Sequence, residues 1–214
     1  VLMKDDPGES HVSIHLETTS EAPITPSGYE PLSHIGCLDV SIKNSKIYVT
    51  DGFSFIEIDS ETNHASGVLN ESMWSDVSIT NSENLGVLMY SIAVLLGYNN
   101  LFLLHSASLV HNSNGYLFLG HSGSGKSTTT LGLIANGWKV LSDDTVLIKS
   151  YHETVECISF RKDMYLKEDT VKKFPWIADH CEPARLPGRK KQRILLKDLF
   201  EDQFQNSCAP NHLI

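Results

Sequence analysis

A glycine-rich segment in the second half of the chain constrains the fold more than any other feature. Residues 120–127 read Gly-His-Ser-Gly-Ser-Gly-Lys-Ser, a complete match to the phosphate-loop motif G-x-x-x-x-G-K-[ST]. The apolar run 115–120 is typical of a strand, and residues 128–136 have helical spacing that ends before Gly137. A loop between a strand and a helix directs backbone N–H groups and the positive helix end towards anionic oxygens. The segment therefore predicts a site for the phosphates of a nucleotide.

Each residue type in the loop predicts its own contact. Lys126 is expected to reach the β and γ phosphates of ATP, and the Ser127 hydroxyl is expected to bind Mg²⁺. The alternative is an accidental match. From average residue usage, the motif is expected by chance in about one of every hundred chains of this length. The strand and helix patterns on either side favour nucleotide binding. The residues expected to contact the nucleotide are Gly120, Ser122, Gly123, Ser124, Gly125, Lys126, Ser127 and Thr128.

Composition and charge narrow the class of protein. The chain has 214 residues, of which 41% are hydrophobic, enough for one large domain or two small ones. Its net charge of -9 argues against sequence-independent binding of nucleic acid, which requires basic surface. The longest apolar run, residues 85–96, is too short to span a bilayer, and the first residues do not resemble a signal peptide. We therefore expect a cytoplasmic protein that binds neither nucleic acid nor a membrane.

The cysteines indicate neither a zinc site nor a disulfide framework. Cys37, Cys157, Cys181 and Cys208 are scattered along the chain without C-x-x-C spacing. Reduced thiols are therefore expected, as is usual in a cytosol.

The character of the sequence changes near residue 100, which predicts two parts. Residues 1–97 are rich in Thr, Ser and acidic side chains and predict a small β-rich part. Two alternating runs, 46–50 and 53–58, flank Asp51-Gly52 and predict a hairpin with a two-residue turn. Apolar spacing within residues 83–96 predicts one packing helix, whose stripe consists of Leu85, Leu88, Met89, Ile92, Leu95 and Leu96.

The two parts are expected to have different tasks. No motif in residues 1–97 brings titratable groups together, so this part is expected to dock a substrate or a second subunit, the latter producing a homo-oligomer. Residues 101–214 are expected to form an α/β phosphate-loop domain. The histidines of the first part are interpreted as surface or packing residues, and they are His11, His15, His34 and His64.

Two adjacent aspartates follow the loop. The run 138–142 predicts a short strand that ends at Asp143 and Asp144, and the run 145–149 predicts the next strand. Carboxylates at a strand end beside a phosphate loop are placed to bind Mg²⁺ or to accept a proton from an attacking hydroxyl. An acidic turn between strands is the alternative, because Asp favours turns by itself. The nearby phosphate loop favours the functional interpretation.

One histidine precedes the loop. His105 ends the strand-like run 101–105, upstream of both the phosphate loop and the aspartates. A single histidine is more often structural than catalytic. The order of histidine, loop and paired aspartates makes His105 a candidate site residue.

These features together resemble the catalytic domain of the HPr serine kinase/phosphorylase family. The residues that carry the resemblance are His105, the loop 120–127, Gly137 and the Leu-Ser-Asp-Asp run 141–144, and it covers residues 101–150. The resemblance implies a fold akin to that of phosphoenolpyruvate carboxykinase. It also implies ATP-dependent phosphorylation of a serine hydroxyl on a small carrier protein.

The resemblance also implies roles for the site residues. Asp143 would be the base on the acceptor hydroxyl, and Asp144 would help hold Mg²⁺ together with Ser127. His105 would orient the carboxylates or the phosphoryl group, and Lys126 would complete the catalytic set. The expected activity is transfer of the γ-phosphate of ATP to a Ser or Thr hydroxyl of a protein or peptide.

The chain departs from the family after the aspartates. The family has an E-[IV]-R-G-x-G stretch, where residues 157–164 of this chain read Cys-Ile-Ser-Phe-Arg-Lys-Asp-Met. Arg161 can stand in for the family's arginine, but the glycines are absent. The resemblance therefore does not imply that this chain phosphorylates HPr itself or that it catalyses the reverse phosphorolysis.

Other phosphate-loop classes can be compared directly. An ABC-type ATPase requires an L-S-G-G-Q-like signature and a GTPase requires N-K-x-D, and the sequence has neither. A small-molecule kinase and a non-catalytic nucleotide sensor remain as alternatives, because the loop alone does not define the acceptor.

The last part of the chain suggests how an acceptor is bound. Residues Arg185–Arg193 concentrate five of the 17 basic residues. This basic run is expected either to be a solvated loop or to fold over the acceptor entrance and steady negative charge. The chain stops at Asn211–Ile214 without a polar tail, so we expect a further C-terminal element that completes the acceptor site.

Overall fold

The computed structural model describes residues 12–21, 30–71, 86–183 and 191–214. The chain divides into two compact units, Val1–Asn99 and Asn100–Ile214. Strands outnumber helices in both, so the chain is a mixed α/β protein built mostly from strands. Within the described ranges, no helix is long and apolar enough to cross a membrane.

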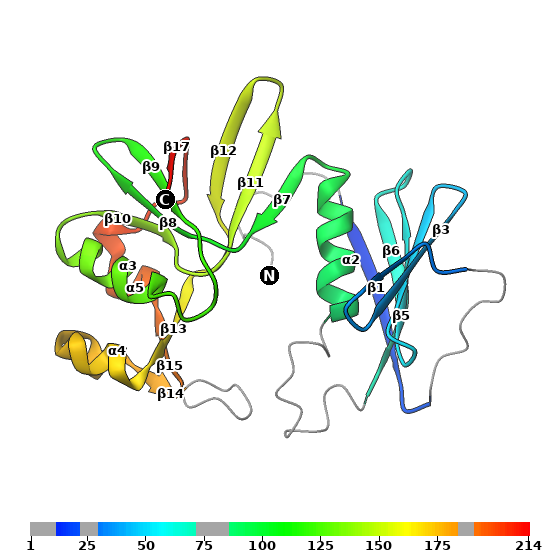
Figure 1. Cartoon of the computed structure of the whole chain (residues 1–214), viewed down its shortest axis with the longest axis horizontal. Coiled ribbons are helices and arrows are strands. Elements are labelled where there is room, and N and C mark those ends of the chain that lie inside the picture. The colour runs from blue at the N-terminus through cyan, green and yellow to red at the C-terminus, as the bar shows by residue number, and fades with distance from the viewer. Residues whose placement is uncertain (1–11, 22–29, 72–85, 184–190) are drawn as a thin grey trace. The chain divides into compact units, whose positions relative to one another are not determined.

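In the described residues of the first unit, helix α2 (Gly86–Gly97) lies on the face of a six-stranded sheet (Figure 1). The strand order is β1-β6-β5-β4-β3-β2, in which only β1 and β6 pair in parallel. Burial alternates along β5, as expected for a strand with one face against a core, whereas β4 buries three successive residues and β3 buries residues at its start. The strands are β1 (Ser13–Thr19), β2 (Ser33–Ile35), β3 (Leu38–Lys43), β4 (Lys46–Thr50), β5 (Phe55–Asp59) and β6 (His64–Asn70).

Strands β4 and β5 form the predicted hairpin, but the predicted two-residue turn is wrong. The last paired residues are Thr50 and Phe55, so the connection spans residues 51–54. The Asp51 carboxylate accepts hydrogen bonds from the backbone N–H groups of Phe53 (2.9 Å) and Ser54 (2.7 Å). An Asp side chain that binds the N–H groups after it stabilises a longer loop, in competition with a tight Asp-Gly turn.

Helix α2 (Gly86–Gly97) packs against β4, β5 and β6. Its fully buried apolar residues are Val87 and Leu95, whereas Met89 is exposed. The predicted stripe is therefore partly wrong, because a helix that is apolar almost all round does not define one buried face by its spacing. Leu85, the first residue of that stripe, lies outside the described residues.

The described residues of the second unit form three sheets, with strand orders β10-β8-β9-β17, β16-β12-β11-β7 and β13-β15-β14. Their strands are β7 (Leu101–Leu104), β8 (Ala107–His111), β9 (Asn114–Phe118), β10 (Lys139–Ser142), β11 (Val146–Tyr151), β12 (Thr154–Ser159), β13 (Asp163–Lys167), β14 (Glu182–Pro183), β15 (Lys191–Leu195), β16 (Ser207–Cys208) and β17 (Pro210–Leu213). Its helices are α3 (Lys126–Ala135), α4 (Glu168–Lys173), η1 (Pro175–His180), α5 (Leu196–Leu199) and η2 (Glu201–Gln203).

A strand-helix-strand segment, β9-α3-β10, runs through the centre of this unit. Both strands pair antiparallel with β8, so they run parallel to each other and α3 connects them. Helix α3 ends at Gly137 as predicted. The Gly137 N–H bonds to the Ile134 carbonyl (2.9 Å) and the Trp138 N–H bonds to the Leu133 carbonyl (3.1 Å), which is a Schellman motif.

The main core of the second unit forms where α3 packs against strands of two sheets. Helix α3 contacts β8, β10 and β13, and α5 contacts β13 and β15. This arrangement holds the N-terminal end of α3 in a fixed position. The buried core residues are Ala107, Leu109, Leu131, Ile134, Val140, Met164, Leu166, Ile177, Ile194, Leu196 and Phe200.

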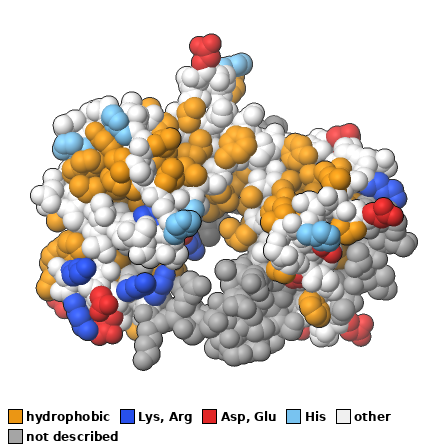
Figure 2. All heavy atoms as spheres, in the orientation of Figure 1, with side chains coloured by type: hydrophobic (Ala, Val, Ile, Leu, Met, Phe, Trp, Pro, Cys, Tyr) orange, Lys and Arg blue, Asp and Glu red, His pale blue; other side chains and the backbone are white. Residues whose placement is uncertain are grey.

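Stacked rings cover part of the sheet β10-β8-β9-β17. Trp138 stacks on His111 with 4.6 Å between ring centroids, and Tyr116 stacks on His212 at 4.5 Å. Tyr116 and Trp138 join the two pairs at 4.8 Å. Figure 2 shows hydrophobic and histidine side chains together over this sheet.

Candidate functional site

The phosphate-loop segment adopts a conformation that requires glycine at several positions. Gly120, Gly123 and Gly125 have φ angles of 151°, 87° and 99°, which glycine adopts at little cost. The Ser124 N–H bonds to the His121 carbonyl (3.1 Å) and closes a turn inside the loop. A Cβ atom on Gly120 would lie 2.8 Å from the Ser124 Oγ, so a side chain there would disrupt this turn.

The loop gathers donors and positive charge at the start of α3. The N-cap residue is Gly125, which has no side chain, so it leaves the first N–H groups of the helix uncapped. The Lys126 ammonium folds back over the loop and donates to the carbonyls of Gly120 (2.6 Å) and His121 (3.1 Å). The helix dipole adds partial positive charge at the same point. These are the groups that bind phosphate at a helix N-terminus.

Asp143 lies buried beside the loop. It follows β10 and is only 3% exposed, and its Oδ2 accepts a hydrogen bond from the Ser127 hydroxyl at 2.7 Å. Burial raises the pKa of Asp143 to about 6, although the hydrogen bond from Ser127 acts in the opposite direction and the neighbouring Asp144 carboxylate raises it further. The Thr130 hydroxyl also acts to lower the pKa of Asp143. Among the described residues, that hydroxyl and Asp143 Oδ1 are both buried without a hydrogen bond of good geometry. The site therefore holds a buried carboxylate with a raised pKa beside the loop.

The donor set around Ser127 fits Mg²⁺. Magnesium prefers oxygen ligands and is usually bound by one or two protein groups together with substrate phosphates. The Ser127 hydroxyl is an oxygen donor at the phosphate loop, and the Asp143 carboxylate beside it adds negative charge without being assigned as a ligand. In the described part of the chain, no three or more His, Cys, Asp or Glu residues are grouped so that they could hold a metal ion. A bound Mg²⁺ would therefore depend on the phosphates of the nucleotide for most of its ligands.

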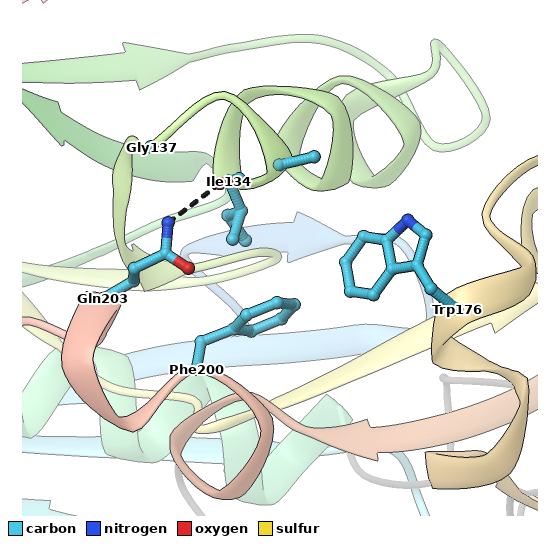
Figure 3. Close-up of a pocket in the computed structure, with 6 residues that line it drawn as sticks. Ile134, Gly137, Trp176, Phe200 and Gln203 are labelled. Carbon is cyan, nitrogen blue, oxygen red and sulfur yellow. Dashed lines mark hydrogen bonds between the residues drawn. The ribbon is translucent and has the colours of Figure 1, made fainter.

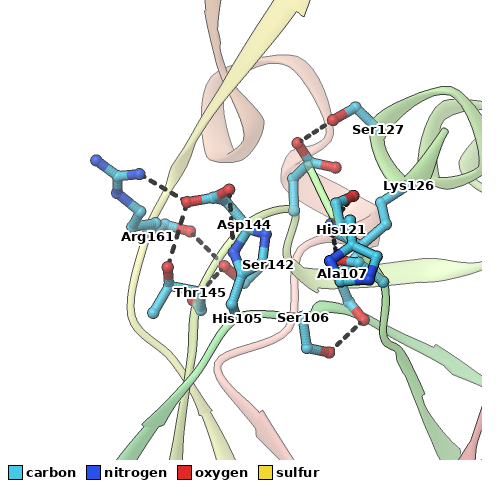
Figure 4. A network of polar contacts seen from close by, with 12 residues as sticks. His105, Ser106, Ala107, His121, Lys126, Ser127, Ser142, Asp144, Thr145 and Arg161 are labelled. Atoms are coloured by element: carbon cyan, nitrogen blue, oxygen red, sulfur yellow. Dashed lines mark hydrogen bonds and ion pairs between the residues drawn. The ribbon is translucent and has the colours of Figure 1, made fainter. Parts of the chain in front are cut away.

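Asp144 belongs to a different cluster, which opens towards solvent. Its Oδ2 accepts from Arg161 Nη1 at 2.8 Å, and its Oδ1 lies 3.4 Å from His105 Nδ1 (Figure 4). The Thr145 hydroxyl also donates to Oδ2, at 3.3 Å. The side chains of His105, Asp144 and Arg161 are 49%, 39% and 44% exposed. We call these three residues the open cluster.

The expectation that Ser127 and Asp144 hold Mg²⁺ together stays a prediction. In the structure Ser127 bonds to Asp143, Asp144 Oδ2 accepts from Arg161 and Thr145, and Asp144 Oδ1 lies near His105. Asp143 and Asp144 follow the end of β10, and their side chains have different partners. Asp143 bonds to Ser127 of α3, whereas Asp144 pairs with Arg161 and lies near His105.

Backbone contacts hold the two aspartates in place. The Ser142 hydroxyl donates to the carbonyls of Thr145 (2.6 Å) and Arg161 (3.3 Å), which joins the turn after β10 to the segment after β12. The Ser106 N–H bonds to the Asp144 carbonyl at 3.0 Å and joins the same turn to the end of β7. Three strand ends therefore meet at the aspartates.

Sequence reasoning missed Lys167. This residue ends β13, and its Nζ lies 3.8 Å from the position that a Cβ atom on Gly123 would occupy. Thr170 of α4 also approaches α3, with its hydroxyl 3.4 Å from that of Thr128. Lys167 therefore brings a second cation to the phosphate loop. No local motif marks it, because the contact joins segments that are far apart in the sequence.

The basic run is described only at its end. Residues 184–190 lie outside the described residues, as does His11 of the first unit. Arg193 lies in β15, where its Nε donates to Asp163 at 3.1 Å and its Nη1 is 3.9 Å from Glu182. The charge of Arg193 is therefore already paired with two carboxylates.

The second unit also has a hollow away from the phosphate loop. It has a volume of about 370 Å³ and lies at the C-terminal end of α3 (Figure 3). Its lining consists of Ile134, Ala135, Gly137, Trp176, Phe200 and Gln203. None of the residues predicted to act in phosphoryl transfer lines it, so the candidate site is the phosphate loop with the two aspartates.

Comparisons with known proteins do not establish a family. No family model and no curated protein matches this chain. Among solved structures, the chain is similar to the Hpr(Ser) kinase/phosphatase from Coxiella burnetii, at 20% identity and a TM-score of 0.36. The similarity covers 52% of this chain and 62% of that one. At this identity and TM-score, it defines neither a family nor the role of a residue.

Proposed function

We propose that the second unit is an ATP-dependent phosphotransferase that moves the γ-phosphoryl group to a hydroxyl. The observation that carries the proposal is the hydrogen bond between Ser127 of the phosphate loop and the buried carboxylate of Asp143. Phosphate binding alone requires donors and positive charge, and a buried carboxylate at the same place costs free energy. A proton transfer during the reaction accounts for a carboxylate with a raised pKa in this position.

Asp143 acts as the general base. A pKa of about 6 is close to neutral pH, where a base is both ionised and able to accept a proton. Ser127 binds Oδ2, so Oδ1 takes the proton of the acceptor hydroxyl. The acceptor oxygen forms the new O–P bond, and the bond from the γ-phosphorus to its bridging oxygen breaks to release ADP.

Ser127 would hold Mg²⁺ together with the phosphates, with the charge of Asp143 close by. When bound, Mg²⁺ neutralises charge on the β and γ phosphates. Lys126 and Lys167 contribute positive charge from either side of the loop. Asp144 is not part of this set, because Arg161 and Thr145 already donate to it.

The open cluster acts on the transferred group. The ion pair with Asp144 involves Arg161 Nη1, and a guanidinium has further N–H donors that suit phosphoryl oxygens. Asp144 is a positioning residue, because it fixes Arg161 and lies beside His105. Arg161 would stabilise charge that develops on the γ-phosphoryl group in the transition state.

The exposure of the open cluster favours a Ser or Thr hydroxyl of a protein or peptide as the acceptor. Small-molecule sites are usually concave and bury most of the ligand. Here all three side chains of the cluster are more than a third exposed. A hydroxyl presented on a polypeptide can reach such an open edge, and the remainder of that polypeptide can exclude water there.

Nucleotide binding is tested by calorimetry with Mg·ATP. The wild-type chain should bind, and Lys126→Ala should lose tight binding because the ammonium that covers the loop is removed. Lys139→Ala is the matched control, since Lys139 is an exposed lysine of β10 in the same unit. Equal affinity of the wild type and Lys126→Ala for Mg·ATP would refute the proposed binding mode.

A further inference from the structure

Cys157 and Cys208 are brought together by strand pairing. Cys157 lies in β12 and Cys208 in β16, and they are direct partners in the antiparallel register. The Ser159 N–H bonds to the Asn206 carbonyl at 2.8 Å, two residues along each strand, so the cysteines also occupy a hydrogen-bonded pair of positions. The Cα atoms of such a pair are about 5.5 Å apart, within the range of roughly 4.4–6.8 Å that a disulfide spans.

The two thiols differ in access and in acidity. Cys157 is fully buried, whereas Cys208 is half-buried and packs at the edge of the same apolar cluster. The hydrogen bond that Cys157 donates lowers the pKa of Cys208. The same hydrogen bond and burial raise the pKa of Cys157, and the Glu156 carboxylate raises the pKa of both thiols. Cys208 is therefore the reachable thiol and forms the thiolate more readily.

Cys208 also lies at the point where the last segment of the chain crosses between two sheets. A Cβ atom on Gly115 of β9 would be 2.7 Å from the Cys208 Sγ, so the lack of a side chain at Gly115 makes room for the sulfur. After Cys208 the chain enters β17, which pairs with β9, and the Gly115 N–H bonds to Asn211 Oδ1 at 2.9 Å. Strand β9 leads directly into the phosphate loop.

We propose that Cys157 and Cys208 form a reversible disulfide modification site that responds to a small disulfide such as oxidised glutathione. The Cys208 thiolate attacks one glutathione sulfur, which forms a mixed disulfide and releases one glutathione thiolate. The Cys157 thiol then attacks the Cys208 sulfur and passes its proton to the second glutathione sulfur, which leaves as a thiol. Two protein thiols are oxidised and one glutathione disulfide is reduced to two thiols, so the exchange balances.

The bond would join the last segment of the chain covalently to β12. That segment also pairs with β9, the strand that leads into the phosphate loop. The disulfide would therefore link β12 and β16 to the segment that holds β9. A disulfide restricts the unfolded chain more when the loop that it closes is long. Oxidation should therefore raise the unfolding temperature of the second unit. This inference does not depend on the proposed phosphotransferase activity.

The test incubates the reduced full-length chain with oxidised glutathione, blocks the remaining thiols and maps peptides by mass spectrometry without reduction. The expected product links the peptide containing Cys157 to the peptide containing Cys208. Cys157→Ser should instead accumulate glutathione on Cys208, because the second thiol is missing. Cys37→Ser is the matched control, because Cys37 is an exposed cysteine of the first unit, and it should form the link as the wild type does.

Thermal unfolding supplies a second readout. Oxidised wild-type protein should unfold several degrees above the reduced form, and Cys208→Ser should show no difference between the two conditions. Cys208 is half-buried, so this variant keeps the fold even where Cys157→Ser does not. A stable glutathione adduct on Cys208 in the wild type without the linked peptide would overturn the proposal, as would a link between other cysteines.

Discussion

Replacement of Asp143 by Asn should stabilise the chain while removing its proposed activity. Burial raises the pKa of Asp143 from 3.8 to about 6. Each pKa unit corresponds to about 1.4 kcal/mol, so a buried carboxylate with this shift costs about 3 kcal/mol when fully ionised. Asp143 is only 3% exposed, so solvent does not screen this cost strongly. Asn has the same shape and no charge, and its amide oxygen can still accept from Ser127.

The sign of the effect depends on pH. Between pH 3.8 and about pH 6 the folded chain holds the proton of Asp143 more tightly than the unfolded chain does. The contribution of this group to the free energy of unfolding therefore falls as pH rises through that window. Asp143→Asn should gain about 3 kcal/mol over the wild type at pH 8, and the gain should shrink steadily as pH falls through the window towards pH 4.

Urea unfolding followed by tryptophan fluorescence measures this difference, because Trp138 and Trp176 both lie in the second unit. Asp144→Asn is the matched control: its carboxylate is 39% exposed and ion-paired, so its replacement should not stabilise the chain. Addition of Mg·ATP should reduce the gain of Asp143→Asn, since the cation offsets the charge. Equal gains at pH 4 and pH 8, or no gain at pH 8, would refute the account of Asp143.

Three further variants test other parts of the account. Lys167→Ala should weaken Mg·ATP binding by about two- to fivefold in calorimetry, as expected for an exposed cation, while Lys173→Ala at the end of the following helix α4 should not; equal affinities would remove Lys167 from the site. Arg161→Ala should lower kcat for phosphoryl transfer by about 10²-fold or more with little change in ATP affinity; an unchanged kcat would refute its role. Gly137→Ala should lower the free energy of unfolding by about 1 kcal/mol, because its φ of 84° is strained for alanine; unchanged stability would contradict the Schellman cap.

Local motifs were predictable from the sequence because the interactions that form them are local. The phosphate-loop glycines, the start of α3 and its end at Gly137 all depend on residues within a few positions of one another. The strands on either side follow from short apolar runs. The hairpin between β4 and β5 was also predictable, but the length of its loop was not. An Asp side chain at position 51 is compatible with a two-residue turn and also with a longer loop, in which it accepts from the N–H groups that follow it.

Contacts between distant segments were not predictable in the same way. Nothing in Asp143-Asp144 indicates which carboxylate faces Ser127, since that depends on how β10 meets α3. The approach of Lys167 to Gly123 and the pairing of Cys157 with Cys208 each join segments that are far apart in the sequence. A spacing rule such as C-x-x-C cannot detect cysteines on neighbouring strands.

Phosphoryl transfer can be measured directly with γ-labelled ATP in the presence of Mg²⁺, with protein and peptide fractions of a lysate as acceptors. The wild-type chain should label Ser or Thr, and Asp143→Asn should lose about 10²- to 10⁴-fold of this transfer, the usual contribution of a general base. Asp143→Asn should still bind Mg·ATP in calorimetry, which separates lost chemistry from lost binding. Transfer by Asp143→Asn at the wild-type rate would show that Asp143 is not the base.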